Sequence, residues 1–423
     1  METITDILIV GTGHAGAQAA IALRTAQYAG RITLVGEDGD LPYERPPLSK
    51  DYLLGDKNFD RLLIRQSNFW QERQIEIIGG CRITNVDAPA HIALAADGRS
   101  FRYQHLIWAT GGRARTLHCP GAQAAGVYTI RHRADADALI AALPRASTAV
   151  VIGGGYIGLE AAAVLRKLGK SVTLLEAGPR VLGRVAGTAL SEFYQAEHQR
   201  QGVDVRLNAQ IAAIEVGQDQ HMQAVRLASG ELLPADIVVV GIGIVSNAEP
   251  LLNAGALGGN GVAVDAYCRS NLADVFAIGD VALHASAWCE GAPIRIESVQ
   301  NASDMATTVA RYLTGSAESY AAIPWFWSQQ YDLKLQTVGL SIGHDEAVLR
   351  GDPDQRSFSV VYLKAGKVIA LDCVNAMKDY VQGKALVQAG AKLSPAQLAD
   401  TSVTLKECFE NLRAQDAPQV TMA

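Results

Sequence analysis

The sequence has few cysteines, and no two of them stand close together. Zinc sites and redox-active dithiols use cysteines separated by only a few residues, so both kinds of site are disfavoured. We expect instead buried or inert thiols in a reducing compartment, and no metal site. The six cysteines of the 423-residue chain are Cys81, Cys119, Cys268, Cys289, Cys373 and Cys408.

Long apolar runs and clusters of basic residues are also missing. No stretch of about 18 uninterrupted apolar residues occurs, and the N-terminus does not resemble a basic-apolar secretion signal. A membrane span and secretion are therefore not expected, and the sequence predicts a cytoplasmic protein. The formal net charge is −6 and no run of Lys or Arg provides a local exception, which disfavours binding to nucleic acid.

Glycine and apolar residues, by contrast, are abundant. The chain has 40 glycines and an apolar fraction of 49%, a composition typical of a soluble α/β protein with many glycine turns. A chain of 423 residues is too long for one ordinary core, since domains average roughly 150 residues. We therefore expect two or three domains.

A glycine-rich turn follows a short apolar segment near the N-terminus. Ile7 to Val10 is apolar and β-branched, which predicts a parallel strand covered on both faces. In the following sequence, Gly11 permits a tight turn, Gly13 lets a pyrophosphate approach the backbone, and Gly16 lets a helix pack close to the strand. The whole turn reads Gly11-Thr12-Gly13-His14-Ala15-Gly16.

A helix, a second strand and an acidic residue complete this first unit. Residues 17–26 predict the helix and residues 31–35 the strand, which ends near Glu37. A carboxylate roughly 20 residues beyond such a turn is placed to accept a hydrogen bond from a ribose hydroxyl. A glycine signature alone is weak evidence, but here the strand, the helix and the acid all follow in the expected order.

The same pattern recurs from residue 148. Residues 149–152 predict a strand, residues 159–168 a helix, and residues 171–175 a strand ending at Glu176. One copy might be only structural, but both keep three glycines and the acid, so we predict two bound dinucleotides. Glu176 would repel a 2′-phosphate, which favours NADH over NADPH, although Arg180 and Arg184 follow soon enough in the chain to weaken this repulsion. The second turn consists of Gly153, Gly154, Gly155, Tyr156, Ile157 and Gly158.

Three further segments are candidates for ligand contact. The proline-rich residues 41–50 predict an extended loop before a short helix from Ser49, and this loop holds either an aromatic cofactor or only solvated cations. Residues 108–112 end a strand in small residues where backbone must approach a ligand. Asp280 follows the strand of residues 275–278 and either faces a ligand or caps the next helix.

The remaining pattern predicts short strands and a smaller third domain. From residue 320 onward the sequence pattern changes and predicts antiparallel strands. Residues 324–327 form an aromatic cluster there, which either belongs to the core or packs against a cofactor. The other predicted strands cover residues 75–78, 82–86, 91–95, 101–107, 236–240, 334–340, 357–363 and 367–373, and the other helices cover residues 298–313, 376–389 and 394–400.

Seven motifs in order make the chain resemble a known family along almost its whole length. It resembles the FAD-dependent ferredoxin reductases that serve bacterial cytochrome P450 and aromatic-ring oxygenase systems. The resemblance implies a glutathione-reductase-like α/β fold with two Rossmann-type domains and a C-terminal α+β domain. The motifs are GTGHAG, LPYERPPLSK, WATGG, VVIGGGYIGLEAA, FAIGDVA, ESVQNA and PWFWSQQYDLKLQTVG.

The resemblance also implies domain boundaries and site residues. The FAD domain would comprise residues 1–115 and 245–320, the NADH domain residues 116–244, and the C-terminal domain residues 321–423. Lys50 and Glu160 match a family pair near the reactive edge of the flavin, although Glu160 might be only a helix acid. The residues implied for FAD are Gly11, Gly13, His14, Ala15, Gly16, Glu37, Arg45, Lys50, Ile83, Ala109, Thr110, Gly111, Arg131, Asp280, Val299 and Trp327. Those implied for NADH are Gly153, Gly155, Tyr156, Ile157, Gly158, Glu176, Arg184 and Gly243.

The activity implied by the resemblance is electron transfer from NADH through FAD to a [2Fe–2S] ferredoxin. The protein would be an oxidoreductase, a ferredoxin–NAD+ reductase, working as a monomer or weak homodimer. A rubredoxin reductase or an NADH oxidase uses the same two nucleotide sites and stays an alternative. A flavoprotein interaction module controlled by its nucleotide is a further alternative, although such a module is expected to carry a basic surface.

Overall fold

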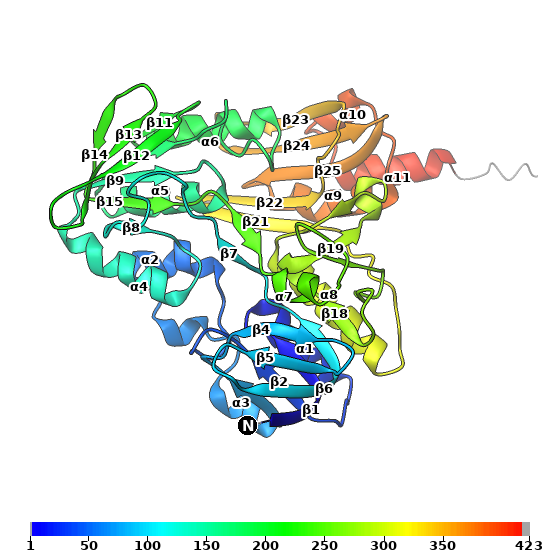
Figure 1. The fold of residues 1–423 in the computed structure, drawn as a ribbon. Helices are drawn as coiled ribbons and strands as arrows, with labels where there is room; N and C mark the ends of the chain where they lie inside the picture. Colours follow the sequence, from blue (N-terminus) through cyan, green and yellow to red (C-terminus); the bar gives the residue numbers. More distant parts are fainter. Residues whose placement is uncertain (1, 417–423) are drawn as a thin grey trace, which may run out of the picture. The chain divides into compact units, whose positions relative to one another are not determined.

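The computed structural model describes residues 2–416, and the chain divides into two compact units (Figure 1). Each unit is assembled from separate stretches of sequence. The first contains the residues up to Leu117, Tyr128–Pro144 and Ile242–Ala322. The second contains His118–Val127, Arg145–Gly241 and the residues from Ile323 onward. The predicted division into four segments stays a prediction.

A seven-stranded sheet forms the centre of the first unit. Its order is β3-β2-β1-β6-β5-β4, and β18 pairs with β6. The strands β3, β2, β1, β6 and β18 run parallel, whereas β5 and β4 form an antiparallel ribbon at the edge. The strands are β1 (Glu2–Val10), β2 (Ile32–Val35), β3 (Ile75–Ile78), β4 (Ile83–Asp87), β5 (Ile92–Ala95), β6 (Ser100–Trp108) and β18 (Val275–Ala277).

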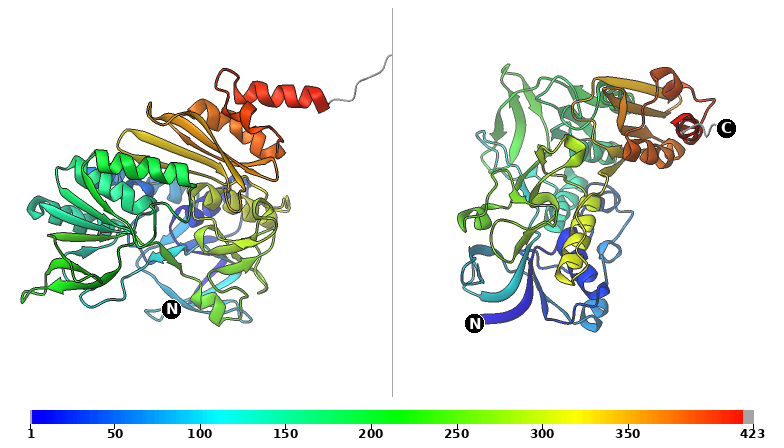
Figure 2. Two further views of the ribbon diagram at one scale, coloured as in Figure 1. Left: turned by 90° about the horizontal axis from the view of Figure 1, so that it is seen from above. Right: turned by 90° about the vertical axis from the view of Figure 1, so that its right-hand side faces the viewer.

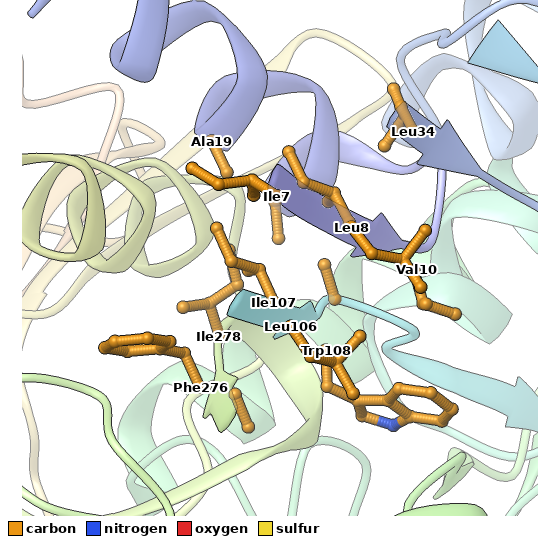
Figure 3. Packing of buried hydrophobic residues seen from close by; sticks show 14 of the residues in the cluster. Ile7, Leu8, Val10, Ala19, Leu34, Leu106, Ile107, Trp108, Phe276 and Ile278 are labelled. Atoms are coloured by element: carbon orange, nitrogen blue, oxygen red, sulfur yellow. The ribbon is translucent and has the colours of Figure 1, made fainter. Parts of the chain in front are cut away.

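The parallel strands of this sheet are buried because helices and loops cover them. Leu8 on β1 and Ile107 on β6 are completely buried, and Phe276 on β18 is 2% exposed. Figure 3 shows these side chains packed together beside α1 (His14–Thr25). Each such side chain contributes roughly 1.5–3 kcal/mol when it leaves water. Helix α1 also packs against α8 (Val299–Leu313), so the first glycine turn starts from a rigid core.

Shorter elements complete the first unit. Among them, β7 pairs antiparallel with β16, and β19 pairs with both β17 and β20. They are η1 (Pro46–Ser49), α2 (Asp51–Leu54), η2 (Phe59–Leu62), α3 (Ser67–Glu72), β7 (Gly112–Ala114), α4 (Arg133–Ala142), β16 (Ile244–Ser246), α7 (Glu249–Asn253), β17 (Val262–Val264), η4 (Gly279–Val281), β19 (Ala282–Ala285), η5 (Ala287–Cys289) and β20 (Pro293–Ile294).

The second unit begins with a five-stranded sheet in the order β11-β10-β9-β15-β8. Strands β11, β10, β9 and β15 are parallel, and β12, β13 and β14 form a separate antiparallel sheet. Two elements, β8 (Val127–Tyr128) and η3 (Leu143–Arg145), have residues in both units. The others are β9 (Thr148–Ile152), α5 (Tyr156–Lys167), β10 (Ser171–Leu175), α6 (Thr188–Arg200), β11 (Val203–Arg206), β12 (Ile211–Val216), β13 (Met222–Leu227), β14 (Leu232–Pro234) and β15 (Ile237–Val240).

The second unit ends with an antiparallel sheet of five strands in the order β21-β22-β25-β24-β23. Helix α9 packs against β22 and β25, and α10 packs against β23. In Figure 2 these elements run from yellow through orange to red along the C-terminal part of the chain. They are β21 (Trp325–Gln330), β22 (Leu333–Gly339), β23 (Glu346–Asp352), β24 (Ser357–Lys364), β25 (Lys367–Val374), α9 (Met377–Ala389), α10 (Pro395–Ala399) and α11 (Leu405–Asp416).

Most predicted elements are present within one or two residues of their expected ends. The proline-rich loop is an exception, because Pro46 and Pro47 begin the 3-10 helix η1 instead of continuing an extended chain. Proline suits the first helical positions, where its missing N–H has no partner to lose. Within residues 2–416, no helix combines the length and the apolar character that crossing a membrane requires.

Candidate functional site

The first glycine turn leaves an open helix N-terminus. Gly11 has a φ of +116°, and a Cβ there would lie 2.3 Å from the Ala109 carbonyl oxygen. A Cβ at Gly16 would lie 1.8 Å from the Gly11 oxygen, so the backbone itself requires both glycines. A Cβ at Gly13 would instead meet only Arg45, at 3.7 Å. The space above α1 is therefore open beside Gly13.

No side chain caps α1, and its first turn carries no acidic residue. The first N–H groups of a helix need an acceptor, and an anion satisfies them while interacting favourably with the helix dipole. Burial, together with Arg45 and Arg131, lowers the pKa of His14 to about 4. His14 is therefore neutral at physiological pH in a positively charged setting. These features fit a pyrophosphate at this N-terminus.

The two arginines beside this turn are ordered by partners within the first unit. Arg45 Nη1 donates to the Arg131 carbonyl oxygen over 2.7 Å, and Arg131 Nη2 lies 3.5 Å from Asp280 Oδ2. The Arg45 side chain is 20% exposed, so the alternative of fully solvated loop cations is wrong for this residue. Arg131 Nε is buried without a hydrogen-bond partner, a donor that a bound anion can use.

Asp280 is held by an ion pair instead of capping a helix. It lies in η4 directly after Gly279, whose φ is +71°. Ser298 caps α8, with its hydroxyl accepting from the Asn301 N–H at 3.1 Å. The alternative that Asp280 caps the following helix is therefore wrong. Its carboxylate stays at the C-terminal edge of β18, where ligands of such sheets bind.

The other candidates of the first unit lie on several strands, helices and loops. Thr110 Oγ1 donates to the Asn247 carbonyl oxygen at 3.0 Å, and Gly111 has a φ of +58°. Glu37 follows β2 with an exposed carboxylate 3.4 Å from Arg82, so its oxygens are accessible to a hydroxyl donor. Ala109 and Ile83 are buried, whereas His14, Lys50 and Val299 are half-buried.

The second glycine turn repeats the geometry of the first. Gly153 has a φ of +108°, and a Cβ at Gly158 would lie 1.9 Å from the Gly153 oxygen. A Cβ at Gly155 would meet nothing within 4 Å. Helix α5 has no side-chain cap and no acid in its first turn. This N-terminus also fits a pyrophosphate.

Glu176 is a structural part of the second turn. Its Oε2 accepts from the Gly154 N–H and its Oε1 from the Gly178 N–H, both at 2.7 Å. Each carboxylate oxygen keeps a further lone pair, so the residue can still accept from a ribose hydroxyl. Arg184 is exposed, and Ile157 is 39% exposed at the start of α5. Gly243 belongs to the first unit, where its oxygen accepts from the Arg115 N–H.

Glu160 and the aromatic cluster lie on neighbouring elements of the second unit. Glu160 is 3% exposed, and its Oε1 accepts from Ser328 Oγ at 2.7 Å. The Tyr156 and Phe326 rings lie 4.6 Å apart, and burial raises the pKa of Tyr156 well above its ordinary value. Trp325, Phe326 and Trp327 at the start of β21 are each half-buried. Core packing and packing against a cofactor therefore both stay open for this cluster.

Sequence reasoning missed several residues that organise these sites. Asn247 holds Thr110, and Ser328 holds Glu160, through partners distant in the sequence. Asp38 accepts from Tyr43 OH at 2.7 Å and anchors the proline-rich loop. The only signal for Asp38 is its place directly after β2 and Glu37. Ser328 stands in the motif PWFWSQQYDLKLQTVG but was not singled out there, and nothing in the local sequence marks Asn247.

Two family models match this chain. Residues 5–306 match the family described as pyridine nucleotide-disulphide oxidoreductase. The chain belongs to this family. Residues 325–409 match the family described as reductase C-terminal, which covers the sheet from β21 to β25 and its helices. The chain is therefore an oxidoreductase with the glutathione-reductase-like fold that the sequence predicts.

Three relatives refine this assignment. The ferredoxin reductase subunit of 5,5′-dehydrodivanillate O-demethylase from Sphingobium sp. is 56% identical over 95% of this chain and 98% of its own. A ferredoxin–NAD(P)+ reductase from Sphingomonas sp. is 52% identical over 96% and 98%. The crystal structure of a covalent putidaredoxin reductase–putidaredoxin complex matches with a TM-score of 0.94 and 37% identity, over 97% and 99%. The chain thus belongs among the flavin-dependent ferredoxin reductases, which use FAD and NAD(P)H.

All six cysteines are free thiols, and four of them are buried. No disulfide joins any of the six, all of which lie within residues 2–416. Burial raises the thiol pKa of Cys373 to about 12 and that of Cys81 above its ordinary value. Thiolates are the reactive form, so these side chains are poor nucleophiles at neutral pH. Across the same residues, no three histidine, cysteine or acidic side chains gather where they could hold a metal ion.

Proposed function

We propose that the chain takes a hydride from NADH onto FAD and passes electrons singly to a [2Fe–2S] ferredoxin. The ferredoxin would feed a cytochrome P450 or a ring-hydroxylating oxygenase. The observation that carries this proposal is the pair of glycine turns, each with an uncapped and sterically open helix N-terminus. Bound FAD supplies the chemistry, since a flavin accepts an electron pair and releases single electrons.

In this proposal, the first unit binds FAD. The N-terminus of α1 binds the pyrophosphate, Glu37 accepts from the adenosine ribose, and Asp280 faces the ribityl chain. Arg45 and Arg131 balance the phosphate charge, and neutral His14 adds no further cation. The proposed FAD residues are Gly11, Gly13, His14, Ala15, Gly16, Glu37, Arg45, Lys50, Ile83, Ala109, Thr110, Gly111, Arg131, Asp280 and Val299, together with Trp327 on β21.

The N-terminus of α5 binds NADH in the same way. The proposed NADH residues are Gly153, Gly155, Tyr156, Ile157, Gly158, Glu176 and Arg184, together with Gly243. Lys50 would place positive charge that favours the reduced flavin, and the carboxylate of Glu160 would orient this ammonium. No side-chain nucleophile or general base is needed, so positioning and electrostatics carry the catalysis.

The remaining proposals concern the location, oligomeric state, domains and partner of the enzyme. We place it in the cytoplasm as a monomer or weak homodimer. The four-segment division predicted from sequence is retained as the proposed domain organisation. A ferredoxin partner is supported by the names of the relatives, two of which are ferredoxin reductases at more than half identity.

The proposed function predicts two separable half-reactions in the purified holoenzyme. Anaerobic addition of NADH should bleach the flavin absorbance near 450 nm, and subsequent addition of a [2Fe–2S] ferredoxin should restore it as the ferredoxin is reduced. A panel of ferredoxins and a rubredoxin, followed by absorbance, measures the acceptor class. If the enzyme reduced only the rubredoxin, or only oxygen, the ferredoxin would not be its acceptor. The protein would then be a rubredoxin reductase or an NADH oxidase. Failure of NADH to bleach the flavin would contradict the proposal at its first step.

The carboxylate of Glu176 predicts a preference for NADH over NADPH. A 2′-phosphate beside it would meet like charge, so kcat/KM with NADH should exceed that with NADPH by at least about tenfold. Glu176→Gln should narrow this ratio, because one oxygen still accepts from the turn while the charge is gone. Arg184→Ala serves as the control for the opposing charge and should widen the ratio. Equal kcat/KM values for the two nucleotides in the unsubstituted enzyme would remove the role of Glu176.

A further inference from the structure

A line of hydrogen bonds in the second unit runs from the turn between β21 and β22 to Glu160. Tyr331 OH lies 3.1 Å from His198 Nδ1. His198 Nε2 lies 2.9 Å from Gln330 Oε1. Gln330 Nε2 donates to Ser328 Oγ over 3.3 Å, and Ser328 Oγ donates to Glu160 Oε1 over 2.7 Å. Side chains from α6, β21 and α5 are thereby joined in one relay.

The relay is enclosed by the protein. Glu160 is 3% exposed, Ser328 and Gln330 are each 1% exposed, and His198 is completely buried. Tyr331, at the far end, is half-buried. Solvent cannot replace a lost partner at such positions, so each polar group depends on its neighbour.

The chemistry of the side chains fixes the direction of the relay. Burial lowers the pKa of His198 below its ordinary value, so the ring is neutral and carries one N–H. The carbonyl oxygen of Gln330 can only accept, which places this N–H on Nε2. Nδ1 is then an acceptor for Tyr331, whose pKa burial raises, so that the phenol keeps its proton. Every donor in the relay therefore points toward Glu160.

This direction determines whether a donor faces the Glu160 carboxylate. The Ser328 hydroxyl can rotate, but the amide N–H of Gln330 occupies its oxygen and leaves its proton for Glu160. If the carbonyl oxygen of Gln330 faced Ser328 instead, the hydroxyl would turn toward it. The N–H of His198 prevents this reversal by holding the Gln330 carbonyl on its own side.

The far end of the relay is fixed by the backbone. Tyr331 has a φ of +56°, in the turn between the paired residues Gln330 and Leu333. Left-handed backbone is uncommon for a residue other than glycine, and it persists where surrounding contacts hold it. The Tyr331 and His198 rings lie 5.1 Å apart. The turn thus holds the phenol at the acceptor nitrogen of His198.

We propose that His198 is a positioning residue for Glu160. Its neutral Nε2–H tautomer acts through Gln330 and Ser328 to keep a hydroxyl donor on the Glu160 carboxylate. This inference rests on the proposed function, in which Glu160 acts during flavin reduction. The relay keeps the Ser328 hydroxyl donating to Glu160 Oε1 and so holds this carboxylate in one orientation. Its loss should therefore slow hydride transfer from NADH and leave NADH binding nearly unchanged.

The test compares anaerobic flavin reduction by NADH in holoenzyme variants, measured by stopped-flow absorbance over a range of NADH concentrations. His198→Leu removes the N–H and should lower the limiting rate constant about tenfold, with the NADH Kd within about twofold. His198→Gln returns an N–H at nearly the same position and should recover most of the rate. Flavin content and Tm are recorded for each variant.

A second variant tests the direction of the relay without leaving a cavity in the core. Gln330→Glu is nearly isosteric, but its carboxylate only accepts, so the Ser328 proton would leave Glu160. We expect a similar, about tenfold loss of rate. The matched control is Gln388→Glu, which adds the same charge at an exposed position on α9 and should keep the rate of the unsubstituted enzyme.

A double-mutant cycle separates positioning from a general structural role. In the Glu160→Gln background, His198→Leu and Gln330→Glu should change the rate less than twofold, because the carboxylate they serve is absent. Equal losses in both backgrounds, or no loss in either, would overturn the proposal. If His198→Leu does not fold, the proposal is tested by Gln330→Glu alone, compared in the unsubstituted and the Glu160→Gln backgrounds. Failure of the proposed function is visible separately, because NADH would then not reduce the flavin of the unsubstituted enzyme.

Discussion

Substitution of Gly158 by alanine is expected to abolish NADH-dependent reduction of the flavin. The new Cβ would lie 1.9 Å from the Gly153 carbonyl oxygen, which is backbone and cannot rotate away. The turn must open and α5 must move away from β9, at a cost on the order of 3 kcal/mol or more. The N–H groups that would hold the NADH pyrophosphate then lose their arrangement.

Gly155→Ala provides a contrast within the same turn. A Cβ there meets no atom of the protein within 4 Å, so Tm should be unchanged. The methyl group would nevertheless occupy the space in which we place the pyrophosphate. The KM for NADH should therefore rise at least about tenfold while flavin content stays the same. Dithionite should reduce the flavin normally in both variants, since Gly11 and Gly16 of the FAD turn belong to the first unit.

Steady-state kinetics, flavin absorbance and thermal unfolding measure these effects together. An unchanged KM in Gly155→Ala would show that NADH does not approach this part of the backbone. A Gly158→Ala enzyme with normal Tm and normal activity would show that the turn can relax without cost. Both outcomes would contradict the assignment of the second turn.

The two glycine turns could be predicted from sequence because their requirements are local. A Cβ at Gly16 or Gly158 would overlap the backbone only a few residues earlier, at 1.8 and 1.9 Å. Only glycine is compatible with such a turn, so the pattern is visible in the sequence itself. The buried strands β1 and β9 were equally predictable, since each is a short apolar run between polar segments.

Helix α6 was not predicted, and its buried face explains why. Glu197 and His198 are almost completely buried there, so the helix lacks a clear apolar stripe. Glu197 is accommodated by Arg356 at 3.0 Å, and His198 by Gln330. Both partners lie far along the chain. Local sequence therefore could not show that these polar positions face inward.

Strand β23 was missed for a related reason. Arg350 lies at one of its inward positions and is 4% exposed. Its guanidinium pairs with Asp379 and donates to the carbonyl oxygens of Asp400 and Val403. Apolar alternation, the usual signal of a strand, is interrupted where such a charge is buried. For Asp280, likewise, local sequence left a helix cap open beside the favoured ligand contact, because Arg131, which pairs with it, is distant in the chain.

Replacement of Asp372 by asparagine is expected to stabilise the protein progressively as the pH rises from about 5 to about 8. Asp372 lies on β25, and its carboxyl accepts from Tyr362 OH at 2.7 Å. Tyr362 OH in turn accepts from the Gly187 N–H at 3.1 Å. Burial raises the pKa of Asp372 from 3.8 to about 7, although the hydrogen bond from Tyr362 opposes this shift. The buried carboxyl is thus held mainly as the neutral acid below pH 7.

The sign of the effect follows from proton binding. Between about pH 4 and pH 7 the folded protein keeps a proton that the unfolded chain has lost, so stability falls as the pH rises. Above the pKa of Asp372 in the folded protein, the full loss in the free energy of unfolding has occurred, and it is on the order of 4 kcal/mol. Asparagine does not titrate and still accepts from Tyr362. Asp372→Asn should therefore not lose stability in this way as the pH rises.

The measurement is the difference in Tm between Asp372→Asn and the unsubstituted holoenzyme at several pH values, by circular dichroism. We expect the difference to grow by on the order of 5 °C between about pH 5 and pH 8. A constant offset would reflect the extra amide N–H and does not affect this slope. Asp354→Asn, which removes an exposed carboxylate from the same sheet region, is the matched control and should give no slope.

Tyr362→Phe tests the same carboxyl by removing the hydroxyl that donates to it. Without the phenol the ionised form of Asp372 loses a donor, so its pKa should rise further and the loss of stability should extend to higher pH. In the Asp372→Asn background, the pH dependence added by Tyr362→Phe should disappear. A Tm difference that is flat from about pH 5 to pH 8 would instead mean that Asp372 is ionised throughout this range. The carboxylate would then be satisfied in the folded protein as well as it is in water, and β25 would carry no titrating core group.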